Sequence, residues 1–82
     1  TALVSYRRAR ERLTHLESAA LASDRATALA RLRFEEGAAD FLEVLDAERR
    51  QLEAHDRLAS GRIEAADWLV TVYRVTGGGV VP

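Results

Sequence analysis

Apolar and small residues recur every three or four positions along the first 34 residues, which is the spacing of one face of an α-helix. This first series is Tyr6, Ala9, Leu13, Leu16, Ala20, Ala30 and Phe34. The residues between them are rich in Ala, Leu, Arg and Glu, all of which favour helices. The pattern therefore predicts a helix over residues 2–34.

The same spacing returns after a break at residues 35–39. The second series is Leu42, Leu45, Leu52, Ala59, Ile63, Ala66, Val70 and Tyr73, and Arg49 and Asp56 occupy two further positions of it. It predicts a second helix over residues 40–76, with this series as the seam toward the first helix.

Both predicted helices also carry apolar residues away from these two series. They are Leu21, Ala28, Leu29 and Leu32 in the first helix, and Leu58, Ala65, Leu69 and Val72 in the second. An isolated pair of helices needs only one buried face on each. The extra residues indicate either that further helices pack alongside or that the alanines only favour helix formation, and we favour the first interpretation.

The break between the helices has the chemistry of a tight turn. Gly37 can adopt a positive φ just past the end of the first helix, and Asp40 precedes Glu43 at the spacing of a helix-capping box. The sequence thus predicts an all-α fold made of one long antiparallel helical hairpin, a coiled coil. Its single domain, residues 1–82, comprises the two helices, a turn at residues 35–39 and a glycine-rich tail at residues 77–82, in which we expect a flexible helix end.

Composition narrows the classes of function. The 82 residues include no cysteine, so disulfides and thiolate metal sites are excluded. Twelve arginines and lysines against thirteen acidic residues give a net charge of −1, which does not favour nucleic acid as a partner. The longest apolar runs are far shorter than the roughly 20 residues of a membrane-spanning helix. Because the chain begins at Thr1 and lacks a signal sequence, we expect a processed chain or an excised fragment.

The sequence offers little support for catalysis. His15 and His55 lie mid-helix without the partners of a metal site, and the glycine run at residues 77–79 follows a helix rather than opening one. The basic cluster in residues 7–12 is spread around the helix and indicates a solvated face. We expect no catalytic residues, no metal and no cofactor.

Two segments resemble a known family. Residues 33–37 have the pattern Arg-aromatic-x-x-Gly and lead into Leu42-Glu43-Val44-Leu45-Asp46-Ala47, and the chain closes on Leu69-Val70-Thr71-Val72-Tyr73-Arg74-Val75-Thr76 before its glycines. Together these segments resemble the second helical repeat of the TolC-like outer membrane efflux proteins that work with resistance-nodulation-division pumps. Residues 1–25 are similar only in being an Ala- and Arg-rich helix.

The resemblance implies a trimeric, lipidated outer membrane channel with a long periplasmic tunnel of helical hairpins, of which this chain would be one. Its partners would be a periplasmic adaptor protein and an inner membrane pump, and the isolated chain is expected to self-associate through its uncovered stripes. By resemblance, the end of the hairpin meets the adaptor, through Phe34, Gly37, Asp40, Phe41 and Leu42. Glu43 and Asp46 match positions that form acidic rings at the pore constriction.

Each of these assignments has an alternative. The two aromatic residues could simply close the coiled coil, and the acidic residues could cap the helix and pair with Arg50. Small residues at Ala38 and Ala39 also leave out the polar groups that close the entrance in some relatives. The chain could instead be the hairpin of a periplasmic adaptor, although its turn lacks the Arg-Leu-Ser pattern found there, or a cytosolic interaction arm.

Overall fold

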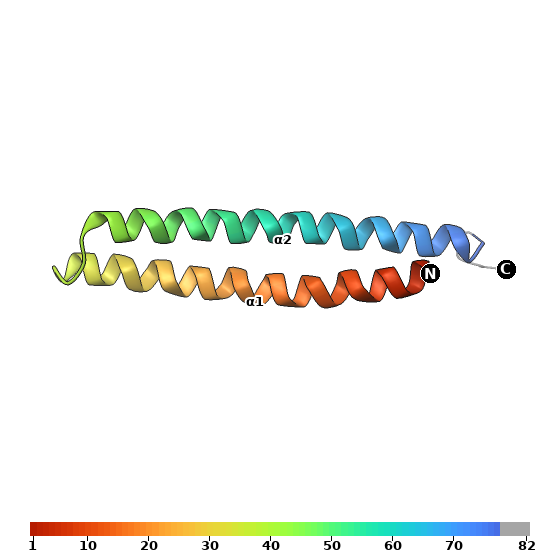
Figure 1. The fold of residues 1–82 in the computed structure, drawn as a ribbon, viewed down its shortest axis with the longest axis horizontal. Helices are drawn as coiled ribbons and strands as arrows, with labels where there is room; N and C mark the ends of the chain where they lie inside the picture. The colour runs from red at the N-terminus through yellow and green to blue at the C-terminus, as the bar shows by residue number, and fades with distance from the viewer. Residues whose placement is uncertain (78–82) are drawn as a thin grey trace.

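The computed structural model describes residues 1–77 as two long antiparallel helices joined by one short turn (Figure 1). Helix α1 spans Ala2–Glu35 and helix α2 spans Phe41–Val75. The hairpin measures 64 × 20 × 14 Å, and no strand is present in the part of the chain described. The predicted all-α antiparallel hairpin is confirmed. Of the predicted glycine-rich tail, residues 78–82 lie outside the described residues.

Side-chain and backbone caps explain where the helices begin and end. The Thr1 hydroxyl accepts a hydrogen bond from the Val4 backbone N–H at 3.2 Å, and the Asp40 carboxylate accepts one from the Glu43 N–H at 3.2 Å. These bonds satisfy N–H groups that have no partner inside the helix. At the far end, Gly77 has a φ of +83° directly after the C-cap Thr76, a conformation that suits glycine.

The contact between the helices, which we call the inward seam, is made mostly of small side chains. Its buried residues are Ala9, Leu13, Ala20 and Thr27 from α1, and Val44, Leu58, Gly61 and Ala65 from α2. The half-buried Leu16 and Trp68 pack against this core. For α1 the seam follows the first predicted series, and Ser23 and Thr27 continue it where the apolar residues stop.

For α2 the predicted seam is wrong. The predicted series from Leu42 to Tyr73 lies on the exposed side of the helix, and the seam is built instead from residues two positions away, including the off-series Leu58 and Ala65. Hydrophobicity ranks the large residues of the exposed series above the alanine, glycine and glutamine of the true seam. Small residues in the seam allow α1 to approach closely, most clearly at Gly61, where an added Cβ would lie 2.5 Å from Leu16 Cδ1.

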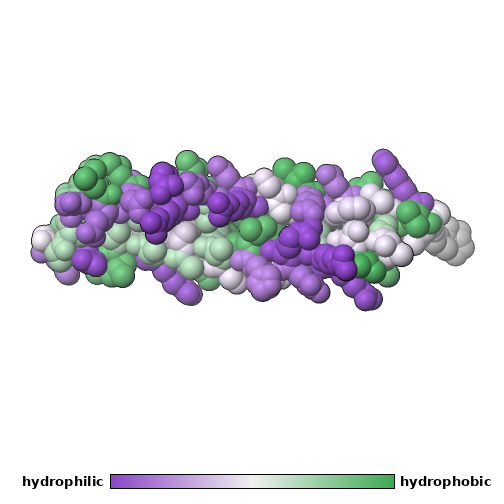
Figure 2. Space-filling model, in the orientation of Figure 1, coloured by the Kyte–Doolittle hydropathy of each residue, from purple (hydrophilic) through white to green (hydrophobic). Residues whose placement is uncertain are grey.

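We call the exposed series the outer stripe: Leu42, Leu45, Leu52, Ala59, Ile63, Ala66, Val70 and Tyr73, together with Arg49 and Asp56. Leu42 is 71% exposed and both Leu52 and Ile63 are 63% exposed. Figure 2 shows hydrophobic surface at the tip of the rod and again at intervals along the α2 edge, between charged side chains. The hairpin therefore leaves its larger apolar side chains uncovered.

Candidate functional site

The tip of the hairpin is locked by its own hydrogen bonds. The Gly37 N–H donates to the Phe34 carbonyl at 3.0 Å, and the Ala38 N–H donates to the Arg33 carbonyl at 2.8 Å. With Gly37 at a φ of +76°, these two bonds form a Schellman motif, which ends α1 as the glycine in the sequence predicts. The Arg33 guanidinium also donates to the Ala38 carbonyl at 3.2 Å, so the turn is fixed from both ends.

Two aromatic rings close the tip. The ring centroids of Phe34 and Phe41 lie 5.4 Å apart at an interplanar angle of 57°, a favourable tilted arrangement. Both rings remain about half exposed. A Cβ placed on Gly37 would meet no atom within 4 Å, so the outer side of the turn is open. The tip thus presents a rigid, partly apolar end with free space over its glycine.

The structure brings four of the five predicted tip residues together. The tilted rings of Phe34 and Phe41 pack against each other across the turn, Gly37 forms the turn and Asp40 caps α2. Leu42 does not join them, because it belongs to the outer stripe and is more exposed than either ring. The capping box is also only half formed: within the described chain the Glu43 carboxylate returns no bond to the Asp40 N–H, and it lines a groove instead.

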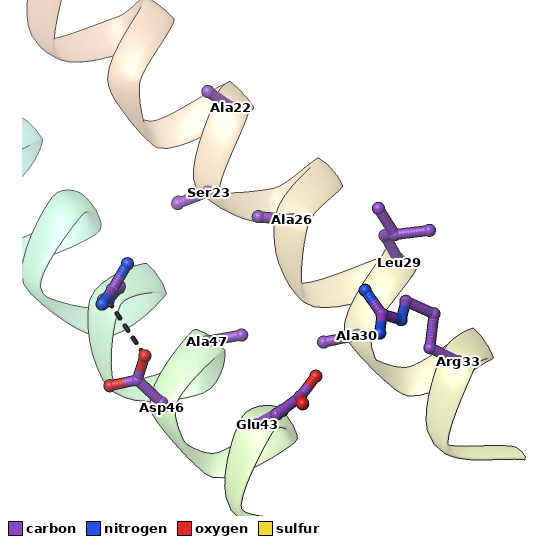
Figure 3. Close-up of a pocket in the computed structure, with 10 residues that line it drawn as sticks. Ala22, Ser23, Ala26, Leu29, Ala30, Arg33, Glu43, Asp46 and Ala47 are labelled. Atoms are coloured by element: carbon purple, nitrogen blue, oxygen red, sulfur yellow. Dashed lines mark ion pairs between the residues drawn. The ribbon is translucent and has the colours of Figure 1, made fainter. Parts of the chain in front are cut away.

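That groove runs between the helices just behind the tip (Figure 3) and has a volume of about 520 Å³. Mostly small side chains line it, Ala22, Ser23, Ala26, Ala30 and Ala47, together with the larger Leu29. Charged side chains border it: Arg33, Glu43, Asp46 and Arg50. In Figure 3 Glu43 and Ala47 point across the groove toward Ala30 and Arg33. Both predicted acidic residues therefore share one face of α2, as their spacing of three requires.

Asp46 is engaged by arginines of its own helix. Its carboxylate lies 2.9 Å from Arg49 Nη2 and 3.1 Å from Arg50 Nε. Arg49 also pairs with Glu53 at 2.6 Å, and the hydrogen bond to Asp46, followed by the charge of Glu53, raises the pKa of Arg49 above its already high ordinary value. The alternative pairing of Asp46 with Arg50 is thus present. The charge of Asp46 is largely balanced on this chain, whereas Glu43 lines the groove without an ion pair among residues 1–77.

A polar cluster midway along the rod was missed in the sequence. The Asp24 carboxylate on α1 accepts a hydrogen bond from Gln51 and lies against His55 Nε2 on α2, each at 2.8 Å. The bond from Gln51, and next the bond with His55, lower the pKa of Asp24 below its ordinary value of 3.8. Gln51 and His55 are four residues apart on α2, but Asp24 lies 27 and 31 residues from them, and only the register of the hairpin brings it to them. His55 therefore ties the two helices, while His15 is an exposed residue.

Thr27 is a second feature that sequence patterns did not single out. It is the one buried polar side chain of the described residues, and its hydroxyl lies 2.9 Å from the Ser23 carbonyl and 3.2 Å from the Ala47 carbonyl. A hydroxyl at this position bridges α1 to the backbone of α2. Two charged pairs, Arg12 with Glu64 and Arg31 with Glu48, join the helices on either side of it.

Residues 1–77 hold no group of three or more metal-ligating side chains. In the same range neither helix is apolar enough along its length to cross a membrane. Searches of protein-family models, curated proteins and solved structures found no match to this chain.

Proposed function

We propose that this chain is an assembly element whose hairpin packs lengthwise against other helices. The observation that carries the proposal is the distribution of side-chain size: small residues fill the inward seam, and large apolar residues face out. Fifteen large apolar side chains of the described residues are exposed, on both helices. Large apolar side chains that recur along one exposed face of a helix are the pattern by which helices pack against further helices.

The energy at stake on the outer stripe alone is large. It holds six large exposed side chains: Leu42, Leu45, Leu52, Ile63, Val70 and Tyr73. Complete burial of such a side chain from full exposure contributes roughly 1.5–3 kcal/mol, and these six are 46–71% exposed, so covering all of them contributes on the order of 5–10 kcal/mol. This is comparable to the whole stability of a small domain. A slender rod with such a stripe is suited to being one helix pair among several.

We further propose, from the resemblance at the turn and at the end of α2, that the full-length protein is a trimeric outer membrane efflux channel. This segment would then be one stave of its periplasmic tunnel, and the channel would work with a periplasmic adaptor and an inner membrane pump. In this role the tip, Phe34, Gly37, Asp40 and Phe41 with Leu42 beside it, would contact the adaptor. The open space over Gly37 and the two half-exposed rings support a contact there.

In the same role, Glu43 and Asp46 would line the entrance, where threefold repetition would sum their negative potential and favour cations. The two acidic residues differ in their ion pairs. Asp46 is balanced by Arg49 and Arg50, so Glu43 would carry the larger part of the selectivity.

The experiment uses the full-length protein in cells that lack their own efflux channel. Restored drug resistance and an outer membrane trimer would support the channel, and a protein that forms no trimer in the outer membrane would overturn it.

The tip is tested by Gly37→Trp, with Gly37→Asn as the matched control because asparagine tolerates a positive φ. We expect Gly37→Trp to abolish resistance with the trimer intact and Gly37→Asn to retain it. Full resistance in the Gly37→Trp variant would remove the adaptor contact.

A further inference from the structure

Large apolar residues occupy the same positions of the outer stripe whether it is followed from Leu42 or from Tyr73. The stripe has ten positions, from Leu42 to Tyr73. The residue number of each position and that of its counterpart, counted from the other end, add up to 115. Leu42 thus corresponds to Tyr73, Leu45 to Val70, and Leu52 to Ile63. Two antiparallel copies of α2 in contact keep the sum of facing residue numbers constant. In this register, large residues face large residues at six of the ten positions.

The two charged positions of the stripe distinguish antiparallel from parallel pairing. In the antiparallel register Arg49 faces Ala66 of the second copy, and Asp56 faces Ala59, so each long or charged side chain lies opposite a small one. A parallel twofold pair would place Arg49 against Arg49 and Asp56 against Asp56. Like charges in direct contact within an apolar seam are unfavourable. The stripe therefore fits an antiparallel copy and disfavours a parallel one.

The net charge of the rod changes sign near the midpoint of the outer stripe. The tip half, residues 19–56, has five arginines and nine carboxylates, a net charge of −4. The base half, residues 1–18 and 57–77, has seven arginines and four carboxylates, a net charge of +3. The midpoint of the stripe register falls between residues 57 and 58. Antiparallel pairing in this register consequently lays each negative tip half along a positive base half, and complementary potentials of this kind select orientation.

We propose that the partner of the outer stripe is a second copy of this chain, bound antiparallel through α2 with Leu52 opposite Ile63 of the second copy. The two α2 helices lie back to back at the centre, and the two α1 helices lie outside. This inference concerns the 82-residue chain and does not rest on the efflux role. A stave in a channel would use the same stripe against a different helix, so either proposal can fail while the other holds.

Orientation is tested by disulfide trapping, for which the absence of cysteine makes the chain well suited. Leu45→Cys and Val70→Cys chains of different mass are mixed, unfolded, refolded and oxidised. Positions 45 and 70 are about 38 Å apart along one helix, at 1.5 Å per residue. We expect mixed disulfides in at least about tenfold excess over either homodimer, because antiparallel pairing separates like positions by this distance. Homodimer disulfides, or a random distribution, would overturn the proposal.

The surface is tested by sedimentation of the native chain and of Leu52→Lys, with Leu29→Lys as the matched control. Leu29 is also exposed, at 57%, but it lies on α1. We expect a native dimer, a dissociation constant raised at least about 100-fold by Leu52→Lys, and little change with Leu29→Lys. Leu52→Glu mixed with Ile63→Arg should associate although neither does so alone. A native chain that is monomeric at about 1 mM, or equal loss with both lysine variants, would overturn the proposal.

Discussion

The two long faces of α2 carry opposite kinds of residue. The inward seam holds the small Gly61 and Ala65 beside its larger members, whereas the outer stripe holds Leu52, Ile63 and Tyr73 beside its two alanines. In an ordinary amphipathic helix the larger apolar residues would be buried and the smaller ones exposed. Small residues in the inward seam therefore allow α1 to approach α2, and the larger apolar residues of the outer stripe are left exposed.

The largest expected effect separates the two faces directly. Leu58 is 6% exposed in the inward seam, and Leu52 is 63% exposed on the outer stripe. We expect Leu58→Ala to lower the free energy of unfolding by about 2–3 kcal/mol, because it leaves a cavity in a core with few other large side chains. Leu52→Ala should change it by less than about 0.5 kcal/mol. Urea unfolding, at protein concentrations too low for self-association, measures both free energies. Equal losses of unfolding free energy in the two variants would remove the distinction between the faces.

The second effect concerns the buried hydroxyl of the seam. Thr27→Ala removes a methyl group and a hydroxyl from a fully buried site, and we expect it to cost about 1 kcal/mol of unfolding free energy. Thr27→Val keeps the volume and should cost no more than about 0.5 kcal/mol, because both carbonyls next to the hydroxyl lie inside helices and keep their backbone partners. Denaturant unfolding of the two variants measures the difference. If valine costs as much as alanine, the hydroxyl contributes more than its volume does.

The fold was more predictable from the sequence than the packing was. The positions of Gly37 and Asp40 mark the turn because each satisfies a local requirement, a positive φ and an N-cap, that needs no knowledge of the partner helix. The face of α2 that meets α1 depends on the interhelical distance, which local patterns do not contain. The contact of Asp24 with Gln51 and His55 likewise depends on register across 27 and 31 residues. The tip residues could be located from the sequence, but the exposure of Leu42 away from the tip could not.

The polar cluster at Asp24 predicts a pH dependence that belongs to the seam and not to the stripe. The pKa of Asp24 is lowered in the folded chain. The contribution of Asp24 to stability is therefore present above its ordinary pKa of 3.8 and is lost as the pH falls through the lower pKa of the folded chain. We expect Asp24→Asn to reduce the acid destabilisation of the hairpin. Gln51→Ala should raise the pKa of Asp24 toward its ordinary value, because the Gln51 bond is the largest cause of the shift. An NMR titration of the Asp24 carboxyl carbon measures this, and an unchanged midpoint would contradict the assignment.

The smallest effect tests how tight the inward seam is at Gly61. A glycine in a helix interior costs about 1 kcal/mol relative to alanine, so Gly61→Ala should gain stability unless the added Cβ meets an obstacle. That Cβ would lie 2.5 Å from Leu16 Cδ1, which is too close, and 3.7 Å from Leu13 Cδ1, which is ordinary contact. Leu16 is only half-buried, so its terminal methyl group can move away at modest cost. We expect a net gain of about 0.5 kcal/mol in the free energy of unfolding.

The obstacle is isolated by repeating the substitution in a Leu16→Ala background. There the clashing methyl group is gone, so Gly61→Ala should gain close to the full 1 kcal/mol, and the difference between the two backgrounds gives the cost of moving Leu16. Alanine at a solvent-facing position of α2 would show no such coupling to Leu16. If Gly61→Ala is destabilising in both backgrounds, an atom other than those of Leu16 obstructs the added Cβ, which would contradict the structure, because the three nearest atoms belong to the Leu16 and Leu13 side chains. Equal gains in both backgrounds would instead mean that Leu16 Cδ1 does not obstruct the added Cβ, contrary to the 2.5 Å between them in the structure.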